Sequence, residues 1–415
     1  MLDDRLILIN KKVFELSSQV KILGPLGWPQ SAEDTFLQGW KQGKVVFPEI
    51  RYKKTDYSEV ISELEKILPE ISGGTPAERI TRRAAVSGIQ AARMVSSVGT
   101  EAFTGYSTEI YGKPGDLMPG TSVTNIHAAK HFVEIANKFT ALAKDSTYEV
   151  CFSSQVMKKH LEKNIVECFQ NNGPTVEVVD GLMSKATAGG KRVRIRGNTS
   201  YSEYDLDQLL MHEVFIHSLT SINGYSQGLK CLAVGPPRTT KAQEGLATFS
   251  ELISGTIDLA RLKRIALRVL AVDMALAGAN FVEVFKFFLE QDQSEQESYR
   301  STARVFRGGF PDKQIVFTKD SVYLDGMIKV HTFFLWAMQS HRVDYLQALF
   351  CGRMALEDIP LLVVLLKNGG VAPPKFLPPW FRKIHGLGGI LAFSLLANDI
   401  SIDDADSYFT SQAES

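Results

Sequence analysis

The spacing of apolar residues predicts a chain that is helical over most of its length. Near the N-terminus, apolar residues recur every three or four positions, and prolines end the first of these segments. Beyond residue 256 the same spacing continues almost without interruption. The predicted helices cover residues 1–22, 31–42, 57–69, 75–98, 154–170, 257–276, 279–290, 294–305, 320–340, 342–350 and 355–367.

Short runs that alternate apolar and polar residues predict strands at 148–152, 175–179, 184–188 and 192–196. A Gly-Gly pair separates the last two runs, as in a hairpin. In the last run, Arg192, Arg194 and Arg196 alternate with Val193 and Ile195, which indicates an edge strand with one charged face. Such an edge either accepts a substrate peptide as an added strand or is only protected from aggregation by its charges. The patterns together predict an α+β fold, mainly helical, with a small mixed sheet.

Composition excludes several classes of partner. Lys+Arg and Asp+Glu number 46 each among 415 residues, so no net charge favours nucleic acid or an anionic membrane. The N-terminus is acidic where a signal peptide is basic, and the longest apolar runs are shorter than the roughly 20 residues of a membrane span. The four cysteines lack a CxxC spacing, which argues against a disulfide framework and against a thiolate-bound zinc. We expect a cytoplasmic protein with no nucleic-acid and no membrane partner.

The strongest chemical signal is HEVFIH, with His212, Glu213 and His217. Two imidazoles beside a carboxylate on an apolar helix are typical of a site that holds Zn²⁺ and activates water. The histidines are five residues apart, however, and on a regular α-helix they would point about 140° apart. A π-type turn would bring them to one face. We therefore expect a distorted helix that begins near Asp205 or Asp207 and ends near residue 223.

A second helix, KAQEGLATFSELISG, is expected to begin at Thr239-Thr240 after a loop rich in Gly and Pro. It places Glu244 and Glu251 on one face, seven residues apart. Either carboxylate could complete a His₂Glu site that keeps one position open for water.

His127 and His131 form a rival pair, four residues apart on an amphipathic helix. No glutamate follows the first histidine, and apolar residues surround both. We expect a structural or surface role for this pair.

HExxxH followed by QEGLA, residues 243–247, resembles the family of metallohydrolases named for its QEGLA motif. The bacterial members of that family are called flavohemoglobin expression-modulating proteins, and the animal relatives are the microtubule-associated tyrosine carboxypeptidases. The resemblance extends from roughly Thr75 onward. It implies that His212, His217 and Glu244 are zinc ligands and that Glu213 is the general base. It also implies a peptide or protein C-terminal tail as substrate, with an aromatic residue leaving.

The order of elements, a sheet followed by the metal-binding helix, is that of zincin-type peptidases. We expect a helical N-terminal subdomain at 1–70 with a packing role, and a zincin-like catalytic domain at 71–415. In the latter, the sheet and metal helix would lie at 145–255 and a helical part at 256–415.

The segment 304–326 brings polar residues onto a loop between helices, which is where binding residues concentrate. Arg304 or Arg307 could bind a substrate carboxylate, and Tyr323 could donate a hydrogen bond to an oxyanion. His331 follows on the same helix, where a structural role is expected.

Other functions remain open from the sequence. An endopeptidase or aminopeptidase would share the metal chemistry and differ in what closes the groove. A non-catalytic regulatory protein could retain a structural zinc, but such a zinc needs no general base, and Glu213 is retained.

Overall fold

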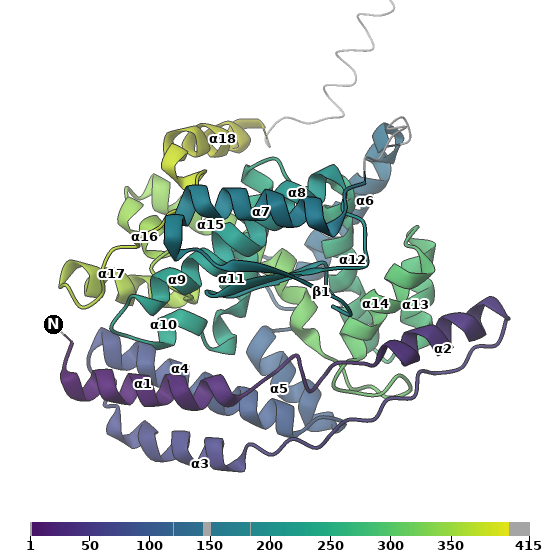
Figure 1. Cartoon of the computed structure of the whole chain (residues 1–415), viewed down its shortest axis with the longest axis horizontal. Coiled ribbons are helices and arrows are strands. Elements are labelled where there is room, and N and C mark those ends of the chain that lie inside the picture. Colours follow the sequence, from purple (N-terminus) through teal and green to yellow (C-terminus); the bar gives the residue numbers. More distant parts are fainter. Residues whose placement is uncertain (1, 119, 144–150, 183, 398–415) are drawn as a thin grey trace, which may run out of the picture.

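The computed structural model describes residues 2–118, 120–143, 151–182 and 184–397, which form a mainly helical protein with a small mixed sheet (Figure 1). The predicted α+β class is therefore confirmed. Across these described ranges, every helix is too short or too polar to cross a membrane.

The observed helices agree with the predicted ones, because caps and apolar spacing mark their ends. Thr75, for example, caps α4: its side chain accepts a hydrogen bond from the Glu78 amide, and the Glu78 carboxylate accepts one from the Thr75 amide. The helices outside the site region are α1 Asp4–Gln19, α2 Gln30–Lys41, α3 Ser58–Ile67, α4 Pro76–Ser96, α5 Glu101–Tyr111, α6 Asn125–Ala143, α7 Ser154–Phe169, α13 Phe281–Glu290, α16 Val343–Ala348, α17 Ile359–Lys367 and α18 Ile384–Ala397.

The N-terminal helices share hydrophobic cores with later parts of the chain. α1 and α3 pack against α4, whereas α2 lies away from them beside α13 and α14, Glu295–Phe306 (Figure 1). The Phe36 ring of α2 meets the rings of Phe281 and Phe285 edge-on, with centroids 5.2 and 4.9 Å apart. A separate subdomain at 1–70 stays a prediction.

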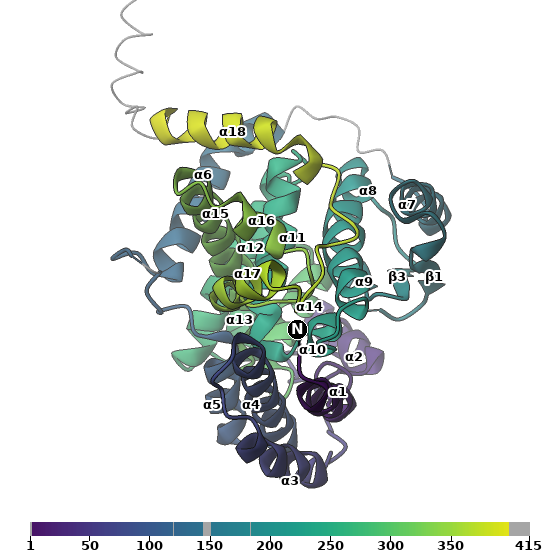
Figure 2. The ribbon, with the colours of Figure 1, turned by 90° about the vertical axis from the view of Figure 1, so that its left-hand side faces the viewer.

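The sheet contains β1 Thr175–Val179, β2 Ala186–Ala188 and β3 Arg192–Arg196, in the order β1-β3-β2. β2 and β3 form the predicted antiparallel hairpin, and β1 runs parallel to β3. Val193 and Ile195 join a core that also contains residues of α7 and of the HEVFIH helix, so the sheet supports that helix (Figure 2). The strand predicted at 148–152 lies mainly outside the described residues, and Phe152 at its end forms one bridge with Tyr201.

β3 is the central strand, so the prediction that RVRIR forms an edge was wrong. β1 pairs with one of its sides and β2 with the other, which leaves no side for an added peptide strand. The alternation itself was interpreted correctly, because Val193 and Ile195 are buried while Arg192 and Arg194 lie 3.7 and 3.6 Å from Glu177. Alternating charge reports that one face of a strand is polar. It does not report whether the strand has two neighbours.

The QEGLA helix, α11 Thr240–Ile253, packs against α15 Val322–Gln339 at unusually short range. A Cβ added at Gly245 would lie 2.3 Å from the backbone of Gly326, so only glycine fits there. The glycine of the motif therefore sets the separation of the two helices, and Glu244 and Tyr323 are positioned by that contact.

Candidate metal centre

His212 and His217 lie on a π-helical segment inside one long helix. The chain runs from α8 Glu203–Leu209 through η3 Leu210–Ser218 to α9 Leu219–Tyr225, and η3 has π geometry. The predicted distortion is confirmed, although it extends over nine residues where a single turn was expected. Because the π repeat suits a spacing of five, the two imidazoles share a face, with ring centroids 4.8 Å apart.

The helix begins earlier than predicted. Ser202 is its cap and forms a capping box with Asp205, which was itself expected to be near the start. The C-terminal end at Tyr225 agrees with the prediction.

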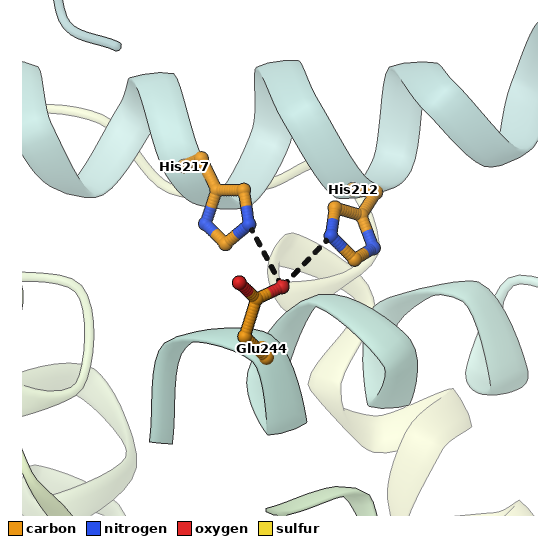
Figure 3. A group of neighbouring side chains, drawn as sticks. All are labelled: His212, His217 and Glu244. Carbon is orange, nitrogen blue, oxygen red and sulfur yellow. Dashed lines mark ion pairs between the residues drawn. The ribbon is translucent and has the colours of Figure 1, made fainter. Parts of the chain in front are cut away.

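Glu244 meets both histidines with one oxygen. Its Oε2 lies 3.4 Å from His212 Nε2 and 3.5 Å from His217 Nε2 (Figure 3). The three ligand atoms lie within 4.8 Å of one another, and no other group of three or more His, Cys, Asp or Glu in the described ranges is arranged in this way. Two imidazole nitrogens and a carboxylate oxygen are a donor set that suits zinc.

Glu251, the alternative third ligand, contacts the opposite side of the His212 ring. Its Oε1 lies 2.6 Å from His212 Nδ1, and Arg261 donates to both carboxylate oxygens at 3.1 and 3.2 Å. Glu251 is fully buried. A carboxylate in this position fixes the orientation and tautomer of a metal-binding imidazole.

The electrostatics of the centre favour a bound cation. Burial alone would lower the pKa of His212, but the carboxylates Glu244 and Glu251 raise this pKa to about 10. Burial alone would raise the pKa of Glu244, but Lys319 and the two histidines lower it well below its usual range. Glu244 is therefore ionised, and positive charge between it and the imidazoles is stabilised.

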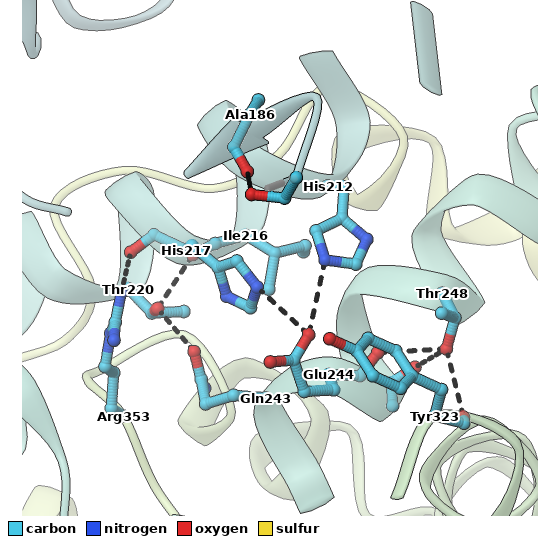
Figure 4. A network of polar contacts seen from close by, with 12 residues as sticks. Ala186, His212, Ile216, His217, Thr220, Gln243, Glu244, Thr248, Tyr323 and Arg353 are labelled. Atoms are coloured by element: carbon cyan, nitrogen blue, oxygen red, sulfur yellow. Dashed lines mark hydrogen bonds and ion pairs between the residues drawn. The ribbon is translucent and has the colours of Figure 1, made fainter. Parts of the chain in front are cut away.

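Glu213 and Arg353 are two further charged residues near the centre: Glu213 directly follows His212 in the chain, and its charge acts on Arg353. Glu213 is buried, and Arg353 donates from Nη2 to the His217 carbonyl at 3.0 Å (Figure 4). Burial lowers the pKa of Arg353, while the nearby carboxylates Glu244 and Glu213 act in the opposite direction. Arg353 thus stabilises the C-terminal end of the π segment and carries a positive charge close to both glutamates.

The predicted loop segment reaches the centre through Lys319 and Tyr323. Lys319 donates to Glu244 Oε1 at 2.9 Å, and its Nζ lies 3.4 Å from the Tyr323 hydroxyl. The Tyr323 side chain points toward Glu244 (Figure 4). Arg304 Nη2 lies 3.5 Å from the same hydroxyl. Tyr323 therefore lies between the third candidate ligand and an arginine.

A cluster of three arginines surrounds Asp320. Arg304 binds it through two nitrogens, at 2.5 and 2.7 Å, whereas Arg268 and Arg307 approach it only to 3.9 and 4.0 Å. The Nε atoms of Arg268 and Arg307 are buried without a hydrogen-bond partner. Burial and the charge of Arg304 lower the pKa of Arg268 to about 9 and that of Arg307 to about 10. One carboxylate is therefore shared by three guanidinium groups.

The structure separates the remaining predicted residues from the centre. His331 packs against the Phe249 ring, with centroids 6.2 Å apart. His127 bonds locally to Thr124, and neither it nor His131 belongs to the group of possible metal ligands found in the described ranges.

Sequence reasoning missed Arg268, Arg261 and Arg353. The first two lie on α12, Leu259–Leu276, seven residues apart and so on one face of a helix that was predicted. The seven-residue spacing of Arg261 and Arg268 could therefore have been used to predict that they lie on the same face. Arg353 follows a short helix in a loop and offers no comparable pattern.

The fold and the site together define an α+β protein with a buried candidate His₂Glu metal centre next to an arginine cluster. The family model described as microtubule-associated tyrosine carboxypeptidase matches residues 36–399, and the chain belongs to this family of carboxypeptidases. The expected relation to the tyrosine carboxypeptidases is thereby confirmed. The match begins well before Thr75 and includes α3, so it covers more of the chain than the motifs suggested.

No curated protein is significantly similar to the chain. Among solved structures, a protein described as a lipoprotein from Colwellia psychrerythraea is similar, with a TM-score of 0.47 and 15% sequence identity. The similarity covers 75% of this chain and 63% of that one, so the chain spans less than two thirds of that protein.

Proposed function

We propose that the chain is a zinc carboxypeptidase that removes a C-terminal aromatic residue from a peptide or protein tail. The observation that carries the proposal is the convergence of His212 Nε2, His217 Nε2 and Glu244 Oε2. The side chains of His217 and Glu244 are 12% and 14% exposed, so solvent reaches this part of the site. The family, which is named for tyrosine carboxypeptidase activity, supports the direction of cleavage and the type of residue released.

Zinc held by these three residues would polarise the scissile carbonyl and activate a water molecule. Glu213 would accept the proton of the attacking water, because it is a buried carboxylate that directly follows His212 in the chain and forms no ion pair within the part of the chain that the structure describes. The Tyr323 oxygen receives the donors Lys319 and Arg304, which leaves its own proton free for another acceptor. Tyr323 would donate that proton in a hydrogen bond to the oxygen that becomes negative.

The arginine cluster would bind the terminal carboxylate of the substrate. Arg304 is already paired with Asp320, so Arg307 and Arg268 are the arginines with donors to offer. Arg307 is 6% exposed, and a carboxylate that replaces water beside it would form a strong, charge-assisted pair. Arg304 would act by holding Asp320 and Tyr323 in place.

We also propose that residues 71–415 form a zincin-like catalytic domain and that residues 1–70 are a helical subdomain packed on it. The support is that the small sheet precedes the HEVFIH helix in the chain and shares its core.

Metal analysis combined with a peptide-library assay tests the proposal. The purified protein should contain about one equivalent of zinc, and it should shorten peptides with aromatic C-termini by one residue. Mass spectrometry of the products identifies the bond that is cut. Internal cleavage, or removal of the N-terminal residue, would refute the carboxypeptidase assignment while leaving the zinc site intact.

A second prediction concerns the terminal carboxylate. Amidation of a cleaved peptide should reduce kcat/KM about tenfold or more, since a charge-assisted hydrogen bond contributes ~1.5–3 kcal/mol. Arg307→Met should cause a similar loss for the free acid and should remove the preference for acid over amide. Arg194→Met is the matched control, because Arg194 lies on β3 next to Glu177. Equal rates for acid and amide in the wild-type protein would contradict the prediction.

A further inference from the structure

Lys319 contacts the third candidate ligand at the oxygen that the histidines do not use. Glu244 Oε2 faces His212 and His217, while Oε1 accepts a hydrogen bond from Lys319 Nζ at 2.9 Å. Lys319 is 8% exposed, so water does not compete strongly for its ammonium group. The two oxygens of one carboxylate therefore have different partners, a pair of imidazoles and a cation.

The position of Lys319 is fixed by bonds on both sides of it. The residue belongs to the short helix η5, Thr318–Ser321. Thr318 donates from its amide to Ser107 Oγ at 2.9 Å and from its hydroxyl to the Ser107 carbonyl at 3.1 Å. On the other side, Asp320 is held by Arg304. Because these partners are buried, the lysine cannot easily move away from Glu244.

We propose that Lys319 is a positioning residue that keeps Glu244 a one-oxygen ligand and so keeps the fourth position of the metal open. The inference rests on the zinc site proposed above. A carboxylate with two free oxygens can bind zinc through both of them and thereby fill the position that a water needs. Lys319 prevents this because it occupies Oε1.

The charge of Lys319 has a second consequence for the metal. A cation that withdraws electron density from the ligand and lies near the metal weakens metal binding by repulsion. Lys319 thus lowers the zinc affinity of the site, but it keeps one coordination position open and makes the metal more electrophilic. A lysine with a purely structural role would have the opposite effect, because its loss would loosen the centre and weaken zinc binding.

Lys319→Met tests the inference without an activity assay. The variant should bind zinc about tenfold more tightly or better, because a buried charge is removed and Glu244 can bind through both oxygens. In the cobalt-substituted protein, its visible absorption should weaken, as expected when the coordination number rises above four. Lys241→Met is the matched control, because Lys241 lies on α11, the helix that carries Glu244, and pairs with Asp325 at 2.6 Å without contacting a candidate ligand. Its affinity and spectrum should equal those of the wild type.

Two results would overturn the inference. One is an unchanged cobalt spectrum, or weaker zinc binding, in a Lys319→Met protein that folds as shown by circular dichroism. The other applies even if this variant does not fold: a zinc-loaded wild-type crystal structure in which Glu244 binds through both oxygens. A wild-type protein that binds no zinc would instead refute the proposed function. The two failures are therefore distinguishable.

Discussion

Glu213→Gln should reduce the rate of peptide hydrolysis about 10²–10⁴-fold, the contribution expected of a general base. The substitution conserves the shape of the side chain but leaves an amide that cannot take a proton from water. The three atoms that converge on the candidate metal position belong to His212, His217 and Glu244. Because Glu213 contributes none of them, zinc content should stay at the wild-type level. Single-turnover kinetics at saturating peptide, together with metal analysis of the same sample, measure both quantities.

Glu177→Gln provides a control of the same chemistry, since Glu177 lies on β1 and pairs with Arg192 and Arg194 away from the centre. It should hydrolyse peptides at the wild-type rate. If Glu213→Gln keeps most of its activity, another group must accept the proton, and the assignment of Glu213 is wrong.

The distortion of the HEVFIH helix was predictable, because only a π turn brings His212 and His217 to one face. Histidines five residues apart cannot meet on a regular α-helix, so HEVFIH required a π turn if it held a metal. The extent of the distortion was not predictable. The π segment continues to Ser218, and just beyond it the Thr220 hydroxyl lies 2.7 Å from the Ile216 carbonyl and 2.9 Å from Gln243 Oε1 of α11, a partner that is distant in the sequence.

The choice between Glu244 and Glu251 as the candidate third ligand shows what helix periodicity cannot predict. Glu244 and Glu251 share a face of α11, and a spacing of seven residues cannot say which of them lies nearer to the histidines. The packing of α11 against η3 separates them: Glu244 reaches the Nε2 atoms, and Glu251 reaches Nδ1 of His212. The roles therefore follow from where the two helices touch along their length, which is a tertiary property.

The arginines show the same limit for charge. Arg304 or Arg307 was predicted to bind a substrate carboxylate, but the sequence did not reveal that Arg304 is already paired with Asp320. Nor did it reveal that Arg268, 36 positions before Arg304 in the chain, joins the same cluster. Local patterns identify which residues are charged and on which face they lie. Pairing is decided by segments that are distant in sequence.

Removal of the proposed third ligand, Glu244, should have the largest effect on zinc binding. Glu244→Gln should abolish tight zinc binding, because two imidazoles alone are a poor site. Glu251→Gln should keep the metal with an affinity about 10–100-fold lower, the usual cost of losing a carboxylate that orients a ligand. Competition with a chromogenic chelator measures both affinities.

His131→Ala is the appropriate control for these variants, because His131 belongs to the rival histidine pair on α6 and should leave zinc affinity unchanged. If Glu251→Gln released the metal while Glu244→Gln retained it, the two carboxylates would have exchanged roles, and the contact between Lys319 and Glu244 would have no bearing on the metal. We expect zinc affinity to decrease in the order wild type, Glu251→Gln, Glu244→Gln. The reason is that only Glu244 places an oxygen, Oε2, near both Nε2 atoms.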